Sequence, residues 1–307
     1  MRKGENEKII IWIFCDKSDI IHFNMKPPKA IADAFPKRPA DMHKRTAGVV
    51  TVVGGSVHFV HAPVIAGLGA RAAGAGLVQL VVPDASRIAA GALLPEATLF
   101  KRSPTCVPPK SDVTAIGMGL GVSADSEALL LRLLAGSPER FVLDADALNI
   151  LAKWQVAGKS ALSLVEGREV VITPHAGEAA RLLGCASADI DRDRIGAVRA
   201  LVNLYHAVAV LKGPHTLVAA PDRAEVFTCD AGNPFMALGG MGDLLSGMIA
   251  ARWAATKKVF EAVCAAVWLH SAASDSLVSA DPPEDPNIVN TARAAASIRV
   301  RLERTSP

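Results

Sequence analysis

Short, continuous hydrophobic runs alternate with longer alanine- and leucine-rich segments from Ala47 onward. Runs without polar interruptions are typical of strands in a parallel sheet that is buried on both faces. The alternation of strands and helices predicts a doubly wound α/β fold, with a mainly parallel sheet and helices on both faces. We predict strands in six runs: AGVVTVV, LVQLVVP, DVTAIGM, RFVLDAD, EVVITP and AVAVLK.

Helix signals fill the intervals between these runs. Pro63 suits the first turn of a helix. The stretch SADSEALLLRLLAG has Ser123 as a candidate N-cap and Gly136 as a candidate terminator. One further helix is predicted from Asp189 to His206. The C-terminal third is predicted to be largely helical, over Gly242 to Ala254, Phe260 to Ser279 and Thr291 to Arg304.

The first 40 residues lack this pattern. Their one apolar run, IIIWIF, is too short to span a bilayer, and a basic, proline-punctuated stretch follows it. We therefore predict an N-terminal extension of low order over residues 1–40. A single domain is predicted over 41–305, because no linker or repeat divides it.

Charge and composition narrow the function. The 307-residue chain carries 33 basic and 30 acidic residues, well interspersed, and has one Tyr and four Trp. This composition argues against nucleic-acid binding. The five cysteines lie far apart without a CxxC pair, which indicates reduced thiols in the cytoplasm and no structural zinc site. No membrane partner is predicted.

Polar and glycine-rich loops follow five of the predicted strands. They read GGS, GMGLG, DADALN, TPHAGE and KGPHT. In a sheet of this kind, ligands bind beyond the carboxyl ends of the strands. We therefore predict that these loops form one site.

The stretch GGMGD places Asp243 after Gly239, Gly240 and Gly242, at the start of a predicted helix. Glycine amides and a helix N-terminus can hold a phosphate or a developing oxyanion. Beside such an anion site, the carboxylate of Asp243 can act as a general base on a substrate hydroxyl. The alternative is that Asp243 only caps the helix.

Three other loops carry candidate ligand-binding groups. Lys212 in LKGPHT suits nucleotide phosphates, or is a solvated lysine in a hairpin turn. In TPHAGE, His175 can meet the substrate and Glu178 can hold magnesium through water; helix capping is the alternative. In LDADALN, Asn149 with Asp144 and Asp146 is ligand-facing or caps a turn.

A pair of polar residues on an apolar C-terminal helix has a different interpretation. His270 and Asp275 are predicted to form a satisfied buried pair rather than a catalytic one. The sequence contains neither GxxxxGK[ST] nor GxSxG, which excludes a P-loop kinase and a nucleophile-elbow hydrolase on their own signatures.

Taken in order, the motifs resemble the ADP/ATP-dependent NAD(P)H-hydrate dehydratases, a branch of the ribokinase-like superfamily. The resemblance runs from about Asp41 to the C-terminal helix. It implies nucleotide-dependent dehydration of the C6-hydrated nicotinamides NADHX and NADPHX, with ADP or ATP as co-substrate and Mg²⁺ as cofactor. The motifs are HK at 43–44, VVGGS, APVIAGLGARAAGAGLV, IGMGLG, LDADALN, TPHAGE, LKGPHT, GNPFMALGGMGDLLSGMIAA and LHSAASD.

The resemblance also implies roles for individual residues. The hydrate-contacting positions are Ala62, Gly119, His175 and Asp243, with Asp243 deprotonating the C6 hydroxyl before its phosphorylation and loss as phosphate. The positions that meet the adenine nucleotide are Lys212, Gly213, Pro214, His215, Thr216 and Gly242, with the Gly240 amide also serving the anion. A homo-oligomer is implied, and a separate epimerase protein would act on the other epimer of the hydrate.

The chain departs from the family pattern at two places. Met241 replaces the threonine of the usual GGTGD, so the side chain either loses a phosphate contact or fills space. Residues Phe59, Val60 and His61 replace a stretch that usually resembles Tyr-Thr-Gly. Two other functions stay open: a ribokinase-like kinase of a small vitamin precursor, and a non-catalytic nucleotide-binding protein.

Overall fold

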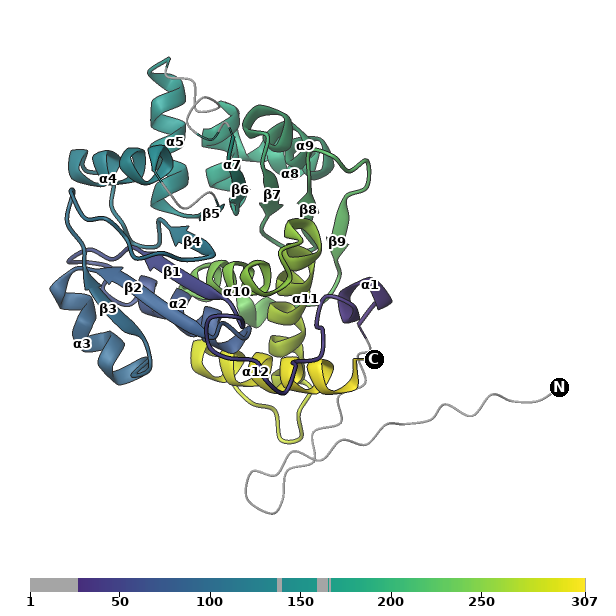
Figure 1. The fold of residues 1–307 in the computed structure, drawn as a ribbon. Helices are drawn as coiled ribbons and strands as arrows, with labels where there is room; N and C mark the ends of the chain where they lie inside the picture. The colour runs from purple at the N-terminus through teal and green to yellow at the C-terminus, as the bar shows by residue number, and fades with distance from the viewer. Residues whose placement is uncertain (1–26, 137–139, 159–164, 166, 307) are drawn as a thin grey trace.

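The computed structural model describes residues 27–136, 140–158, 165 and 167–306. In this part of the chain, a nine-stranded sheet has the strand order β3-β2-β1-β4-β5-β6-β7-β8-β9 (Figure 1). Strands β1 to β7 pair in parallel, and β8 and β9 are antiparallel.

All six predicted strands are present. They are β1 (Val49–Val53), β2 (Leu77–Val82), β4 (Val113–Ile116), β5 (Arg140–Leu143), β6 (Glu169–Ile172) and β7 (Val208–Leu211). Three further short strands, at the two edges of the sheet, were not predicted. These are β3 (Thr98–Lys101), β8 (Thr216–Ala219) and β9 (Phe227–Cys229).

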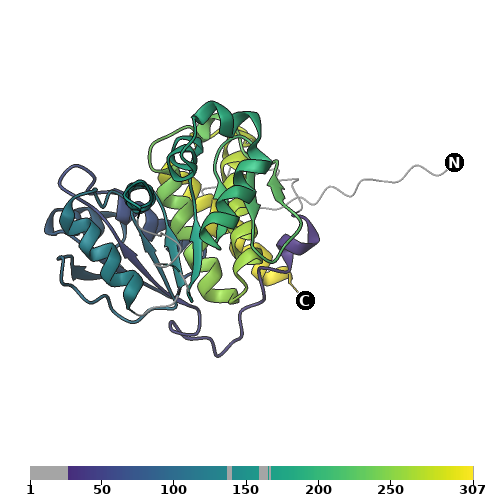
Figure 2. The same ribbon diagram turned by 90° about the horizontal axis from the view of Figure 1, so that it is seen from above.

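Helices cover both faces of the sheet (Figure 2). Because side chains alternate along a strand, Val52 faces one core and Val53 the other. The first core lies under α1 (Lys29–Ala32), α2 (Ala62–Ala72), α3 (Asp84–Leu93), α10 (Met241–Thr256), α11 (Val259–Val278) and α12 (Ile288–Thr305). The second lies under α4 (Ala124–Ala135), α5 (Asp146–Val156), α7 (Ala176–Leu183), α8 (Ser187–Arg192) and α9 (Arg194–Tyr205).

Most of the helix signals are confirmed, but one prediction is wrong. The hydroxyl of Ser123 accepts from the Ser126 amide at 3.3 Å, and Gly136 is the C-cap of α4. The single helix predicted over 189–206 is instead two helices that break at Asp193. The Asp193 carboxylate accepts from the Gly196 amide at 2.8 Å and so starts α9 as its N-cap.

Two glycines let α2 and α10 pack backbone against backbone. A Cβ on Gly69 would overlap the carbonyl oxygen of Leu244, and a Cβ on Gly247 would overlap that of Ala66. Only glycine permits this approach, because every other residue carries a Cβ. The crossing fixes the start of α10 relative to α2, and both helices begin at the predicted site.

Part of the predicted N-terminal extension packs into the first core. Ile31 is buried, and the ring of Phe35 is 0% exposed. The guanidinium of Arg252 lies 4.3 Å from the centroid of that ring. Packed structure therefore extends upstream of the predicted boundary at residue 40, while the IIIWIF run lies outside the described residues.

Three arginines donate hydrogen bonds to backbone carbonyls at the C-terminal end of α2. Arg299 donates to the Ala72 carbonyl at 2.9 Å, Arg252 to Ala73 at 3.3 Å, and Arg38 to Gly74 at 2.6 Å. All three also pair with the buried carboxylate of Glu303. Cations are favourable at this end of a helix, and the cluster ties the N-terminal segment, α2, α10 and α12 together.

We expect truncations to separate the two parts of the N-terminal segment. Removing residues 1–24 should leave activity unchanged, since every motif lies at or beyond His43. Removing residues 1–40 should lower the melting temperature sharply, because it deletes Phe35 and Arg38. In the full chain, Phe35→Ala should cost about 3 to 5 kcal/mol of unfolding free energy. Equal melting temperatures for the two truncations would show that this segment does not stabilise the fold.

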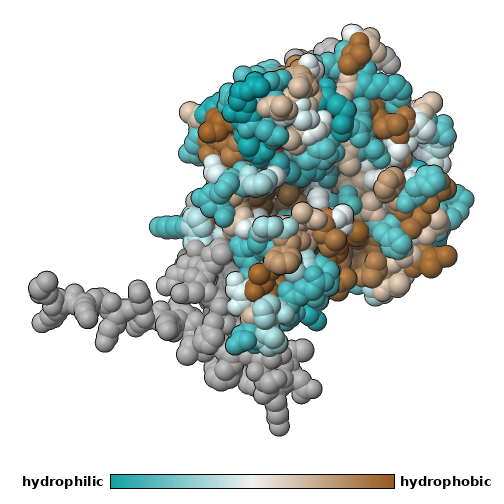
Figure 3. Space-filling model, turned by 180° about the vertical axis from the view of Figure 1, so that it is seen from behind, coloured by the Kyte–Doolittle hydropathy of each residue, from teal (hydrophilic) through white to brown (hydrophobic). Residues whose placement is uncertain are grey.

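The described part of the chain contains no helix long and apolar enough to cross a bilayer. On the face shown in Figure 3, hydrophobic residues form patches among hydrophilic ones rather than a continuous band.

Candidate active site

The loops after β1 and β4 meet as predicted. A Cβ on Gly119, whose φ is +63°, would lie 2.5 Å from the Cβ of Phe59 and 3.1 Å from that of Ala62. Ala62 is the first residue of α2. The two predicted substrate positions, Ala62 and Gly119, are therefore neighbours, and Phe59 lies beside them with an exposed side chain.

Lys212 lies between carboxylates from two other loops. Its Nζ is 2.8 Å from Asp144 Oδ1 and 3.7 Å from Glu178 Oε2, and its side chain is only 18% exposed. Burial disfavours the charged lysine, but Asp144 and Glu178 outweigh that penalty and raise the pKa of Lys212 above its usual value. Lys212 follows β7 in a hairpin turn, yet it is not an ordinary solvated lysine.

Asp144 connects three elements at the end of β5. Its side chain is buried, and Oδ1 accepts from Lys212 Nζ and, at 2.9 Å, from the Ala145 amide. Oδ2 accepts a hydrogen bond from the hydroxyl of Ser246 at 2.7 Å. Ser246 lies on α10, one turn after Asp243. This network holds Lys212 at a fixed place beside the start of α10.

Asp243 is not the N-cap of its helix. The N-cap is Gly240, with φ +96°, so Asp243 is the third residue of α10. First-turn amides of a helix lack intrahelical acceptors, and those of Gly242 and Asp243 find none elsewhere among the described residues. A Cβ on Gly242 would lie 3.3 Å from Lys212 Nζ. The glycine thus leaves room for an anion between these amides and the lysine.

The charge state of Asp243 suits a general base. Burial raises its pKa to about 7, and the carboxylates of Asp144, Asp146 and Glu178 add to the rise against the opposing effect of Lys212. A base with a pKa near the working pH combines ionisation with a strong tendency to accept a proton.

His175 and Glu178 form the capping box at the start of α7. His175 Nδ1 accepts from the amides of Gly177 at 3.0 Å and Glu178 at 3.3 Å, and Glu178 Oε2 accepts from the His175 amide at 2.8 Å. The capping interpretation is therefore correct. The His175 ring is still 55% exposed, so it remains accessible to a substrate.

The carboxylates do not form a direct metal site. No group of three or more His, Cys, Asp or Glu residues in the described chain is arranged to hold a metal ion. The Asp144 carboxylate accepts hydrogen bonds from Lys212 and Ser246, and the Glu178 carboxylate accepts one from the His175 amide. These residues would therefore contact magnesium only through water, with the ion bound directly by the nucleotide phosphates.

The side chain of Asn149 forms hydrogen bonds within and around the turn after β5. Its Nδ2 donates to Asp146 Oδ1 at 3.3 Å, and its Oδ1 accepts from Arg181 Nε at 3.0 Å. Asp146 Oδ2 in turn accepts from the Gly121 amide at 2.7 Å. These bonds match the capped-turn alternative and tie the loops after β4 and β5 together.

The predicted nucleotide segment, residues 212–216, comprises the turn between β7 and β8 and the first residue of β8, Thr216. Thr216 Oγ1 donates to the Gly213 carbonyl at 3.0 Å, and His215 Nδ1 lies 3.0 Å from Asp230 Oδ1. Arg194 on α9 supports the turn by donating to the Leu211 carbonyl at 3.1 Å. Sequence reasoning missed Arg194 and Ser246, because their partners are distant along the chain.

The predicted pair of His270 and Asp275 is wrong. His270 is buried, its Nε2 finds no partner among the described residues, and burial lowers its pKa to about 4. Asp275 faces the loop before α10 instead, accepting from the Gly232 amide and the Asn233 side chain.

Met241 is a core residue, with its side chain 4% exposed in the first core. We expect Met241→Thr to cost about 2 kcal/mol or more of unfolding free energy. Nucleotide affinity should stay unchanged, because the side chain at this position is buried in the first core and is not exposed to a ligand. Melting curves and calorimetric titration of both proteins test this; tighter nucleotide binding by the threonine variant would restore the phosphate-contact interpretation.

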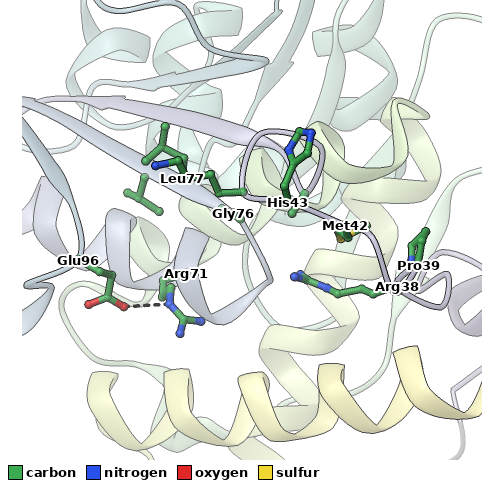
Figure 4. Close-up of a pocket in the computed structure, with 12 residues that line it drawn as sticks. Arg38, Pro39, Met42, His43, Arg71, Gly76, Leu77 and Glu96 are labelled. Carbon is green, nitrogen blue, oxygen red and sulfur yellow. Dashed lines mark hydrogen bonds and ion pairs between the residues drawn. The ribbon is translucent and has the colours of Figure 1, made fainter.

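A cavity of about 710 Å³ lies elsewhere, at the amino ends of β1 and β2. Figure 4 shows Arg71 bonded to Glu96 along one side of it, with Arg38 on the other. Asp243 and Lys212 lie near the carboxyl ends of the strands, so this cavity is separate from the candidate active site.

Comparisons with known proteins identify the family of the chain. Residues 50–288 match the family model of the NAD(P)H-hydrate dehydratases. The chain is 39% identical over 244 residues to the ADP-dependent (S)-NAD(P)H-hydrate dehydratase of Neisseria meningitidis serogroup B, covering 78% of this chain and 81% of that protein. It is 37% identical over 248 residues to the bifunctional NAD(P)H-hydrate repair enzyme of Escherichia coli K12, covering 80% of this chain but only 46% of that one.

Two solved structures have a fold similar to that of this chain. The Bacillus subtilis ADP/ATP-dependent NAD(P)H-hydrate dehydratase, co-crystallised with ATP and Mg²⁺, superimposes with a TM-score of 0.78 at 26% identity, covering 89% of this chain and 96% of that one. A ribokinase-like protein of Enterococcus faecalis V583 has a TM-score of 0.76 at 24% identity, covering 89% and 94%. The fold is thus ribokinase-like, and the chain belongs to the NAD(P)H-hydrate dehydratase family.

Proposed function

We propose that this enzyme dehydrates NADHX and NADPHX to NADH and NADPH at the expense of ADP or ATP. The observation that carries the proposal is Asp243, whose pKa is near 7, at the start of α10 beside Lys212. A general base adjoining an anion site is what transfer of a phosphoryl group to a hydroxyl requires.

The proposed reaction has three steps. Asp243 takes the proton of the C6 hydroxyl, and the oxygen attacks the terminal phosphorus of the nucleotide. The bond from that phosphorus to its bridging oxygen breaks, so ADP leaves from ATP, or AMP from ADP. The nitrogen lone pair of the ring then expels inorganic phosphate from C6. Loss of a proton from C5 restores the dihydropyridine.

The chain supplies positioning and charge rather than covalent chemistry. The amides of Gly242 and Asp243, together with the ammonium of Lys212, would bind the transferred phosphoryl group. Ala62, Gly119 and His175 would hold the hydrated ring near Asp243. Residues 213–216 would bind the remainder of the nucleotide.

Three further features belong to the proposal. Magnesium, bound to the nucleotide phosphates and reached by Glu178 through water, neutralises phosphate charge when present. A homo-oligomer is expected, and light scattering of the purified protein tests it. The chain spans about half the length of its bifunctional relatives. We also propose that a separate epimerase protein is a partner in the repair.

Incubation with hydrated NADH, Mg²⁺ and either nucleotide tests the proposal. Dehydration releases inorganic phosphate and restores absorbance of the reduced nicotinamide. A vitamin-precursor kinase would instead accumulate a phosphate ester of its own substrate, and a non-catalytic protein would bind nucleotide without turnover. No recovery of absorbance with either nucleotide would reject dehydration.

We expect kcat/KM for the hydrate to rise about tenfold per pH unit below pH 7 and to level off above it. The sign follows because Asp243 must be ionised to act, and its pKa is about 7. Rates over pH 5 to 9 at saturating nucleotide give the profile. A flat profile down to pH 5 would mean that no group with this pKa controls the reaction.

A further inference from the structure

The loop from Asp230 to Gly240 connects β9 to α10 and ends at the proposed phosphate site. Most of its residues are exposed, including Phe235 and Leu238. Packing against the core therefore contributes little to its position. Its conformation must come from hydrogen bonds instead.

One carboxylate anchors the beginning of this loop. Asp275 Oδ2 accepts from the Gly232 amide at 2.8 Å, and Oδ1 accepts from Asn233 Nδ2 at 2.8 Å. Asn233 Nδ2 also donates to the buried Ser274 hydroxyl at 3.0 Å. Both acceptors are on α11, a 20-residue helix that is buried over most of its length.

Consecutive turns carry this anchor to α10. Asn233 caps a 3₁₀ turn (η2, Pro234–Met236), with its Oδ1 accepting from the Phe235 amide at 3.1 Å. The Leu238 amide then donates to Met236 O at 2.8 Å, and the Met241 amide to Leu238 O at 3.3 Å. Hydrogen bonds thus run from Asp275 to the first residue of α10.

The charge of Asp275 supports a role in the loop. Each oxygen of Asp275 accepts from one loop donor, and charge-assisted bonds of this kind are stronger than neutral ones.

We propose that Asp275 is a positioning residue that acts through Asn233 to hold the Gly242 and Asp243 amides in place for the nucleotide phosphate. The inference rests on the proposed function, because it assumes that these amides bind nucleotide. It assigns a role to Asp275, which lies on α11 rather than in any of the strand-end loops.

An amide and carboxylate exchange tests the inference. Asp275→Asn replaces one acceptor by a donor that faces another donor, and Asn233→Asp sets two carboxylates against each other. Each single variant should weaken binding of Mg²⁺-ADP or Mg²⁺-ATP by about tenfold to a hundredfold in calorimetry. KM for the nucleotide should rise more than kcat falls.

The double variant Asn233→Asp/Asp275→Asn restores complementary donors and acceptors, so it should recover most of the lost affinity. Glu261→Gln is the matched control: it removes a carboxylate from the same helix, where Glu261 pairs with Arg223, and should change neither affinity nor KM. Nucleotide affinity within twofold of wild type in both folded single variants, or no recovery in the double variant, would overturn the inference. Calorimetry without hydrate keeps this result separate from the proposed dehydration, which fails only if the wild type shows no turnover.

Discussion

Replacing Asp243 by asparagine is expected to lower turnover by at least about a hundredfold while nucleotide binding stays largely intact. The amide keeps the size of the side chain but cannot accept the proton of the C6 hydroxyl. Asp146→Asn is a suitable control, because it removes a neighbouring carboxylate that bonds to the Gly121 amide and Asn149 rather than facing the anion site. That variant should keep most of the activity.

The same substitution should also stabilise the protein at high pH. The pKa of Asp243 rises from 3.8 to about 7 on folding, so its contribution to stability is fully present below pH 4 and is lost as pH rises through 7. The neutral amide of the Asp243→Asn variant carries no such penalty, and we expect this variant to gain on the order of 3 kcal/mol above pH 7. Chemical denaturation at pH 4 and pH 8 measures the difference.

Together these two measurements exclude a trivial loss of activity through unfolding. An Asp243→Asn protein that is more stable than wild type at pH 8 and inactive has lost its base. One that keeps more than about a tenth of wild-type turnover would show that another group takes the proton.

The sequence was sufficient for six strands of the sheet and for placing the predicted loops at their carboxyl ends. Strands β1 and β4 to β7 are largely buried on both faces, so their runs are mostly apolar, with Thr51 and Thr114 as buried polar exceptions. Because these strands are parallel, their polar termini lie at one edge. Strand β3 was missed because most of its residues are exposed, and β9 because it contains only three residues. The alternation of apolar and polar residues cannot identify a strand over so short a segment.

Contacts between distant segments account for most of what could not be predicted. Ser246 and Asp144 are 102 residues apart, and nothing in either local stretch indicates their hydrogen bond. Likewise, Asp275 and His270 are two polar residues on one apolar helix, which favoured a pair that the structure does not contain. The burial of Ile31 and Phe35 had a weak signal, since their spacing of four residues suits one helix face.

Removing the charge of Lys212 should have the largest effect on stability. In Lys212→Met the carboxylate of Asp144, 1% exposed, loses its ion-pair partner. Breaking a buried pair on one side typically costs about 3 to 5 kcal/mol. Lys212→Met also removes the cation that lowers the pKa of Asp243, so the pH at which kcat/KM is half-maximal should move above 7. Asp146→Asn removes a carboxylate that raises this pKa, so it should move the half-maximal pH below 7.

Lys212→Met/Asp144→Asn separates the structural role of the lysine from its role in binding. Without either charge, no uncompensated carboxylate remains buried, and most of the lost unfolding free energy should return. Nucleotide affinity should not return, because the ammonium beside Gly242 is still missing. If the double variant is as unstable as Lys212→Met, the ion pair is not what stabilises this region. If instead it binds nucleotide as tightly as the wild type, Lys212 is a structural residue and the phosphate rests on the α10 amides alone.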